Sequence, residues 1–140
     1  MEKQEVPDGP PSQEEAEAIF DSFREIMEVG SRDPVFGHRL ALAQTVAHVH
    51  VSDADDLTLS LLLDREPIEA IEGKVGDAEV ELFIKSRDID RFWNGEMHLA
   101  MAIAEGKVQY RGPVRKLLRI VPIALRLTPK YVEMRNGGSK

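Results

Sequence analysis

Residues 106–112 read GKVQYRG, a short alternating run with a glycine at each end. The segment before it, EMHLAMAIAEG, is rich in Met and Ala, and the segment after it, PVRKLLRIVPIALRL, is basic and apolar. Glycines let a short strand bend at the edge of a sheet. We therefore predict an edge strand between two helices, with the first helix apolar nearly all round and hence buried on all sides.

The second of these helices, expected over residues 113–127 and opened by Pro113, carries an unusually wide apolar surface. At about 100° per residue, the basic side chains fall within about 40° of arc. Packing on a sheet needs an apolar stripe of only about 100°, yet here the apolar side chains span about 180°: Leu117, Leu118, Ile120, Val121, Ala124, Leu125 and Leu127. Pro122 predicts either a kink or the end of the helix near residue 121. This apolar surface, wider than packing on a sheet requires, indicates that the helix covers something apolar besides the protein's own core.

Three upstream segments alternate with the period of a strand: TVAHVHV, LTLSLLLD and AEVELFIK, at residues 45–51, 57–64 and 78–85. Each has one apolar and one wetter face, which is typical of a sheet that helices cover on one side only. Residues 52–56 are short enough to form a hairpin turn between the first two strands.

Helices are expected on either side of these strands. Ser12 and Glu15 form a capping box, and apolar residues at helical spacing then run to Gly30, which predicts a helix with a glycine C-cap. Ser86 is expected to cap a second helix that Gly95 ends. Residues 31–39 and 65–77, which contain Pro and Gly, are predicted to be a loop and a long connection.

The composition is that of one globular domain. The 140 residues are 42% hydrophobic and 31% charged, with no apolar run near the 18 residues or more of a membrane span. The absence of Cys and of an apolar N-terminal stretch favours a cytoplasmic location. We predict a disordered tail over residues 1–11, a domain over 12–132 and a flexible tail over 133–140.

Charge is distributed unevenly along the chain. The net charge is −7, yet residues 106–140 hold nine Lys and Arg against one Glu. Arg115, Arg119 and Arg126 on the last helix therefore either meet an anionic partner, such as a membrane surface, or neutralise the acidic body. Nucleic acid is not expected, because the whole chain is acidic and only Tyr110 and Tyr131 lie in the basic segment to stack on bases.

Catalytic and metal-binding motifs are weak. His48 and His50 project from one strand face, as two metal ligands could, with His98 or Glu96 as a third; we favour plain polar surface. Three aspartates, Asp53, Asp55 and Asp56, lack the spacing of a calcium-binding loop. We expect them to form a solvated turn. No nucleophile, phosphate loop or zinc motif appears, so we expect no cofactor, no metal and no enzymatic activity.

The ordered pieces resemble the sterol carrier protein 2 family. The resemblance is carried by AEVELFIKSRDIDRFWNG at residues 78–95 and by AMAIAEGKVQYRG at residues 100–112. It implies an α/β (α+β) fold: a single, mostly antiparallel sheet of about five strands covered on one face by helices, with an apolar cavity between. It also implies a non-catalytic protein that binds and transfers a lipid, sterol or fatty-acyl ligand.

The inner arcs of the two apolar helices and the adjacent aromatic pair predict the pocket lining. These residues are Phe92, Trp93, Met97, Met101, Leu117, Val121 and Leu125. Two alternatives stay open. One is an enzyme that acts on a hydrophobic small molecule in the same cavity, with His98 or Tyr110 as acid or base. The other is an interaction module that forms a homodimer through the last helix.

Overall fold

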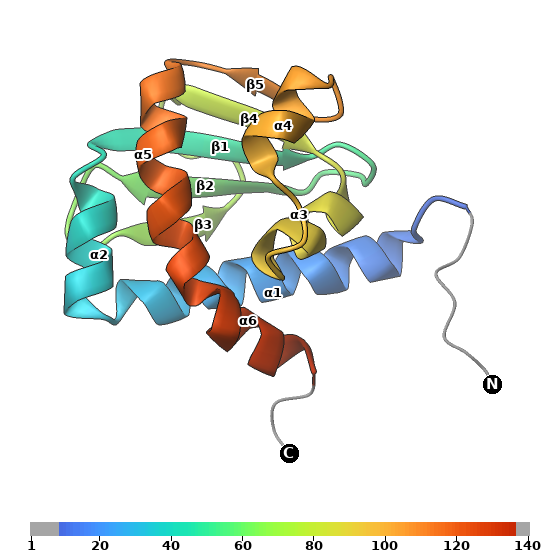
Figure 1. Cartoon of the computed structure of the whole chain (residues 1–140), viewed down its shortest axis with the longest axis horizontal. Coiled ribbons are helices and arrows are strands. Elements are labelled where there is room, and N and C mark those ends of the chain that lie inside the picture. The colour runs from blue at the N-terminus through green and yellow to red at the C-terminus, as the bar shows by residue number, and fades with distance from the viewer. Residues whose placement is uncertain (1–8, 137–140) are drawn as a thin grey trace.

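A five-stranded sheet forms one layer of the protein, and helices cover one of its faces (Figure 1). The structure is a computed structural model that describes residues 9–136. The strands lie in the order β3-β2-β1-β4-β5, with bounds β1 Thr45–Val51, β2 Thr58–Leu63, β3 Glu69–Glu72, β4 Val80–Ile84 and β5 Gln109–Arg111. β1 and β4 are parallel, whereas the other three neighbouring pairs are antiparallel. The predicted fold class is confirmed.

The alternation of the strands separates the two faces of the sheet. Ala47 and Val49 of β1 and Val80 of β4 point toward the helices and are buried. His48 and His50 alternate with them and so lie on the opposite face. In the direct register of the parallel pair, His48 lies beside Glu81.

Helix α1, Gln13–Ser31, begins where the sequence predicts. The Ser12 side chain accepts a hydrogen bond from the Glu15 backbone N–H at 3.0 Å. Gly30 is not the expected C-cap but lies inside the helix, where a Cβ would come within 2.5 Å of the Phe36 ring. The glycine is therefore required by close packing on the next helix.

Two predicted connections contain regular structure. The expected loop at residues 31–39 is largely helix α2, Pro34–Ala41, because Asp33 caps it through its carboxylate and Pro34 occupies the first turn, where its missing N–H costs nothing. The expected long connection at residues 65–77 contains the four-residue strand β3. Pairing with β2 stabilises a strand too short to show a clear sequence pattern.

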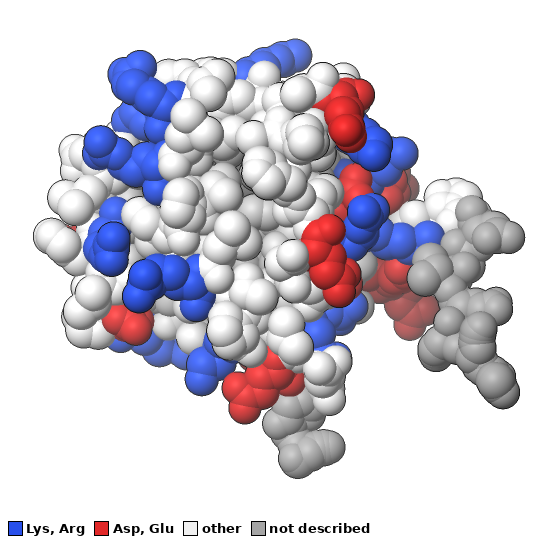
Figure 2. All heavy atoms as spheres, in the orientation of Figure 1, with Lys and Arg blue, Asp and Glu red and all other residues white. Residues whose placement is uncertain are grey.

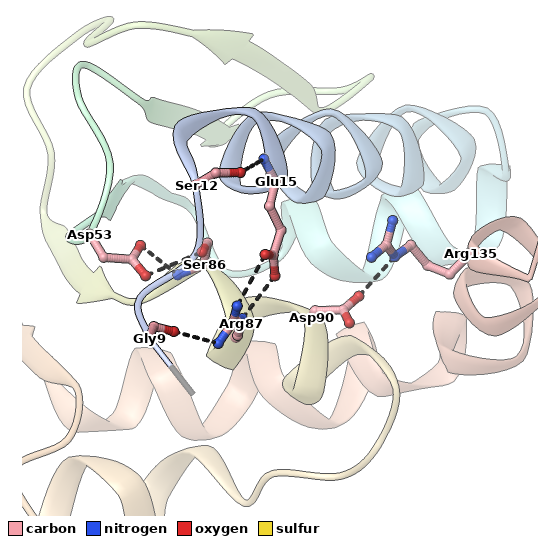
Figure 3. Close-up of polar contacts among 8 residues, drawn as sticks. All are labelled: Gly9, Ser12, Glu15, Asp53, Ser86, Arg87, Asp90 and Arg135. Carbon is pink, nitrogen blue, oxygen red and sulfur yellow. Dashed lines mark hydrogen bonds and ion pairs between the residues drawn. The ribbon is translucent and has the colours of Figure 1, made fainter. Parts of the chain in front are cut away.

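Helix α3, Ser86–Trp93, is held by long-range polar contacts (Figure 3). Ser86 is its first residue rather than its cap: its backbone N–H and its hydroxyl both donate to Asp53, in the turn after β1. Arg87 forms an ion pair with Glu15 of α1 at 2.8 Å, and this partner lowers the pKa of Glu15. These bonds fix the start of α3 against both α1 and the sheet.

Helix α4, Leu99–Ala104, is shorter and more exposed than expected. Only Leu99 and Ala102 are buried, whereas Met101 is 56% exposed. A six-residue helix presents one narrow face to the core, so the prediction that this helix is buried on all sides is wrong.

The C-terminal region continues beyond the helix that the sequence predicts. Helix α5, Val114–Ala124, passes through Pro122, so it does not end near residue 121. A 3-10 turn, η1, Leu125–Leu127, then leads into helix α6, Thr128–Arg135. The predicted boundary at residue 132 falls inside α6. The predicted N-terminal tail lies mostly outside the described residues, as do residues 137–140 of the predicted C-terminal tail.

The two glycines around β5 are not equivalent, which yields a stability prediction. Gly112 has φ +130° and a Cβ there would lie 2.6 Å from the Glu79 carbonyl oxygen, whereas Gly106 has φ +79° and open space around it. We expect Gly112→Ala to lower the free energy of unfolding by about 2–3 kcal/mol and Gly106→Ala by about 1 kcal/mol. Denaturant unfolding of both variants checks this. Equal losses would show that the close approach of β5 to β4 is not what requires Gly112.

Candidate functional site

An apolar cavity lies between the sheet and the helices. Its volume is about 100 Å³. The sheet contributes Ala47, Val49, Leu61, Leu63, Val80, Leu82, Ile84 and Tyr110, and the helices contribute Phe23, Met27, Leu40, Ile89, Phe92, Trp93, Leu99, Leu117, Ile120, Val121 and Ala124. The hydroxyl of Tyr110, the one hydroxyl-bearing residue in this lining, donates to the Pro113 carbonyl at 2.7 Å. The lining thus offers a ligand only apolar contacts.

A wider groove of about 610 Å³ lies between α5 and the segment that joins α3 to α4. Four residues line both spaces: Phe92, Leu99, Leu117 and Val121. These four side chains therefore form the wall between an open groove and the interior cavity.

The structure distributes the predicted pocket residues over these two spaces. Phe92, Trp93, Leu117 and Val121 line the cavity. Met97 and Leu125 line the groove instead. Met101 lines neither, because the one buried face of α4 is taken by Leu99 and Ala102. The rest of the cavity lining comes from α1, α2, the apolar strand faces and further residues of α3, α4 and α5. The alternation of β1, β2 and β4 indicates which strand faces are apolar, but not that they line a pocket.

Trp93 lines the cavity and packs against another aromatic ring. It is 3% exposed and stacks on Tyr131 of α6, with 5.9 Å between the ring centroids. The Tyr131 hydroxyl donates to Asp90 of α3 at 2.7 Å; burial first, and then this carboxylate, raises the pKa of Tyr131 well above its ordinary value. Arg135 also donates to Asp90 (Figure 3). Helix α6 is thereby attached to α3 at the rim of the site.

Basic side chains border the face of the molecule that α5 forms. Figure 2 shows Lys and Arg gathered along one side of the surface that α5 forms. Arg115, Arg119 and Arg126 are exposed, and Arg115, Lys116 and Arg119 line a shallow pocket against the end of α2. Lys116 does neutralise an acid, Glu79, at 3.3 Å. Arg115 and Arg119 lie on α5, which also carries exposed apolar residues, with Val114 60% and Leu118 58% exposed. Arg126 lies in the η1 turn rather than on the predicted long helix.

The two residues considered as acid or base have structural hydrogen bonds. Nδ1 of His98 accepts from the Met101 backbone N–H and so caps α4. Tyr110 is engaged with Pro113, and burial raises the pKa of its hydroxyl, which makes it a weaker acid.

Comparisons with known proteins agree with this architecture. No family model matches the sequence, and no curated protein matches it. Among solved structures, sterol carrier protein 2 from Yarrowia lipolytica superposes with a TM-score of 0.65 at 18% identity, over 81% of this chain and 92% of that one. A protein described as UbiJ-SCP2 ubiquinone synthesis protein gives 0.60 at 16% identity, over 90% and 98% of the two chains.

The sterol carrier protein domain 2 of Helicoverpa armigera gives a TM-score of 0.59 at 14% identity, over 86% and 96% of the two chains. The chain therefore has the sterol carrier protein 2 fold, and the resemblance seen in its sequence is confirmed at the level of fold. Within residues 9–136, no helix has the length and apolar character that crossing a membrane requires.

Proposed function

We propose that the protein binds a lipid-like apolar ligand, such as a fatty acid or sterol, between its sheet and its helices, and transfers it without chemical change. The observation that carries the proposal is the continuous apolar lining that the cavity and the groove share through Leu117 and Val121. Two solved structures with the same fold are described as sterol carrier proteins, which supports the choice of ligand class.

Binding requires the site to open. Pockets that enclose ligands measure roughly 300–1,000 Å³, so a cavity of about 100 Å³ is too small for an acyl chain. Four side chains line both the cavity and the groove, and two of the four, Leu117 and Val121, belong to α5. Outward movement of α5 would join the two spaces into one site that a ligand enters through the groove.

A titration with a fluorescent fatty acid tests the proposal. We expect saturable binding with one probe per chain, and competition by unlabelled lipids. Probe fluorescence that rises without saturation, or that competing lipids leave unchanged, would contradict an internal site.

Pro122 supplies a weak point in α5. It lacks an N–H for the Leu118 carbonyl, which an uninterrupted helix would bond, and it lines the groove. We expect Pro122→Ala to restore this bond, to stabilise the fold by up to about 3 kcal/mol, and to slow ligand dissociation more than it changes the equilibrium affinity. Stopped-flow release of the fluorescent fatty acid measures the rate.

Pro129 offers a matched control for this experiment. It lies in the first turn of α6, where no helical hydrogen bond is lost, so Pro129→Ala should leave the release rate unchanged. If Pro122→Ala is well folded and releases the probe as fast as the parent protein, the break in α5 has no part in ligand entry.

A further inference from the structure

The sheet face opposite the cavity carries a cluster of three side chains with metal-ligand chemistry. His48, His50 and Glu81 each offer one ligand atom, and these three atoms lie within 4.8 Å of one another. His48 and His50 come from β1, and Glu81 comes from the parallel neighbour β4. The sequence supplied the histidine pair but not its partner, because only the register of β1 and β4 brings Glu81 to this place.

We propose that His48, His50 and Glu81 bind a divalent transition-metal ion, with zinc as the best match. Two imidazoles and one carboxylate form a ligand set that Zn²⁺ accepts, with water completing the coordination. His98 and Glu96, the third ligands considered from the sequence, lie at the groove on the helix side of the sheet instead.

The distances need only a small adjustment. Ligand atoms around a tetrahedral zinc ion lie about 3.4 Å apart, given bond lengths of about 2.0–2.1 Å. His50 Nε2 already lies 3.1 Å from Glu81 Oε2. The wider separation within the cluster, up to 4.8 Å, closes with a movement of about 1–1.5 Å by one side chain.

Hydrogen bonds support each histidine in the way that metal-binding histidines are supported. The ring of His48 bonds through Nε2 to the Val75 carbonyl at 3.0 Å. The ring of His50 bonds through Nδ1 to the Thr58 hydroxyl at 3.1 Å. A bond from the second ring nitrogen to a protein oxygen fixes the tautomer and orients the ring, and both rings have one.

Packing further restricts the cluster while leaving it accessible. His48 is 5% exposed, and the ring of His50 stacks on Phe83 with 4.5 Å between the centroids. The side chains of His50 and Glu81 are 13% and 27% exposed, so an ion can reach them from solvent. The rings thus lose little freedom on binding, which distinguishes this cluster from mobile surface acids.

The positive charge of Arg111 would repel the proposed ion. Arg111 Nη1 lies 3.5 Å from Glu81 Oε1, the oxygen that does not contact His50. The Arg111 side chain is 72% exposed, so it can turn away into solvent. Its removal should therefore strengthen metal binding, an effect that a purely structural ion pair would not produce.

The test is a calorimetric titration of the full chain with ZnCl₂, using protein without a histidine tag. A second readout is the visible absorption of added Co²⁺. We expect one ion per chain. Glu81→Gln, which keeps the side-chain shape, and His50→Ala should each weaken binding by about 100-fold or more, since loss of even a supporting residue costs 10–100-fold. Arg111→Gln should tighten binding about threefold.

His38→Ala is the matched control, because His38 also pairs with a glutamate, Glu66, but has no third ligand within the cluster distance among residues 9–136. It should leave zinc affinity unchanged. The proposal fails if the parent protein shows no saturable binding, if folded Glu81→Gln binds as tightly as the parent, or if His38→Ala removes the signal.

Discussion

Replacing Val121 with Asp is expected to weaken binding of a fluorescent fatty acid by at least about 100-fold, or about 2.7 kcal/mol. Val121 lines both the cavity and the groove, so the new carboxylate would stand in the wall through which the ligand passes. A buried charge without a partner is costly, and an acyl chain cannot offset that cost. Fluorescence titration measures the loss, and circular dichroism and a thermal melt show that the variant remains folded.

Val114→Asp is the matched control for this variant. Val114 lies on the same helix, is 60% exposed and lines neither space. The Val114→Asp variant should bind the fluorescent fatty acid with the affinity of the parent protein. A folded Val121→Asp variant that also binds normally would show that the ligand does not occupy this site.

Replacing Arg115, Arg119 and Arg126 with Gln is expected to lower association with anionic vesicles by about 100-fold. Each basic residue near an anionic surface contributes about 1 kcal/mol. The chain as a whole has a net charge of −7, so such a membrane attracts it only through a local basic surface. Vesicle co-sedimentation measures the association, and high salt should weaken it in the parent protein.

The same number of charges removed elsewhere provides the control. Lys74, Lys85 and Lys107 are exposed and lie outside α5, and their replacement by Gln changes the net charge equally. This triple variant should retain most of its vesicle binding. If the two triple variants bind alike, or if the parent protein ignores anionic vesicles, the three arginines serve only to balance the acidic body.

Local patterns predicted the fold where a single segment determines its own structure. The three long strands, β1, β2 and β4, could be predicted because their apolar and polar residues alternate. This alternation indicates that helices cover one face of each strand and leave the other face open. Helix α2 was missed because Asp33-Pro34 suits a loop as well as the start of a helix. Strand β3 was missed because its four residues depend on pairing with β2, and no local pattern predicts the parallel pairing of β1 with β4.

In the candidate site, too, some residues could be predicted from local patterns and others depend on how distant segments pack. The excess apolar surface of α5 and the Phe92-Trp93 pair pointed to residues that line the cavity and the groove. Met101 lines neither space, and periodicity does not reveal how short α4 is or which face it buries. Glu81 could not be linked to His48 and His50, because the contact depends on the register between two strands far apart in the sequence.

Native mass spectrometry of the gently purified protein would show whether the chain carries a lipid. We expect a monomer that carries one apolar adduct of lipid mass, which Val121→Asp lacks and Val114→Asp retains. A ligand-free dimer would instead assign the exposed apolar residues of α5 to contact with a second copy. A ligand-free monomer that also takes up no added fatty acid would contradict lipid binding by this fold.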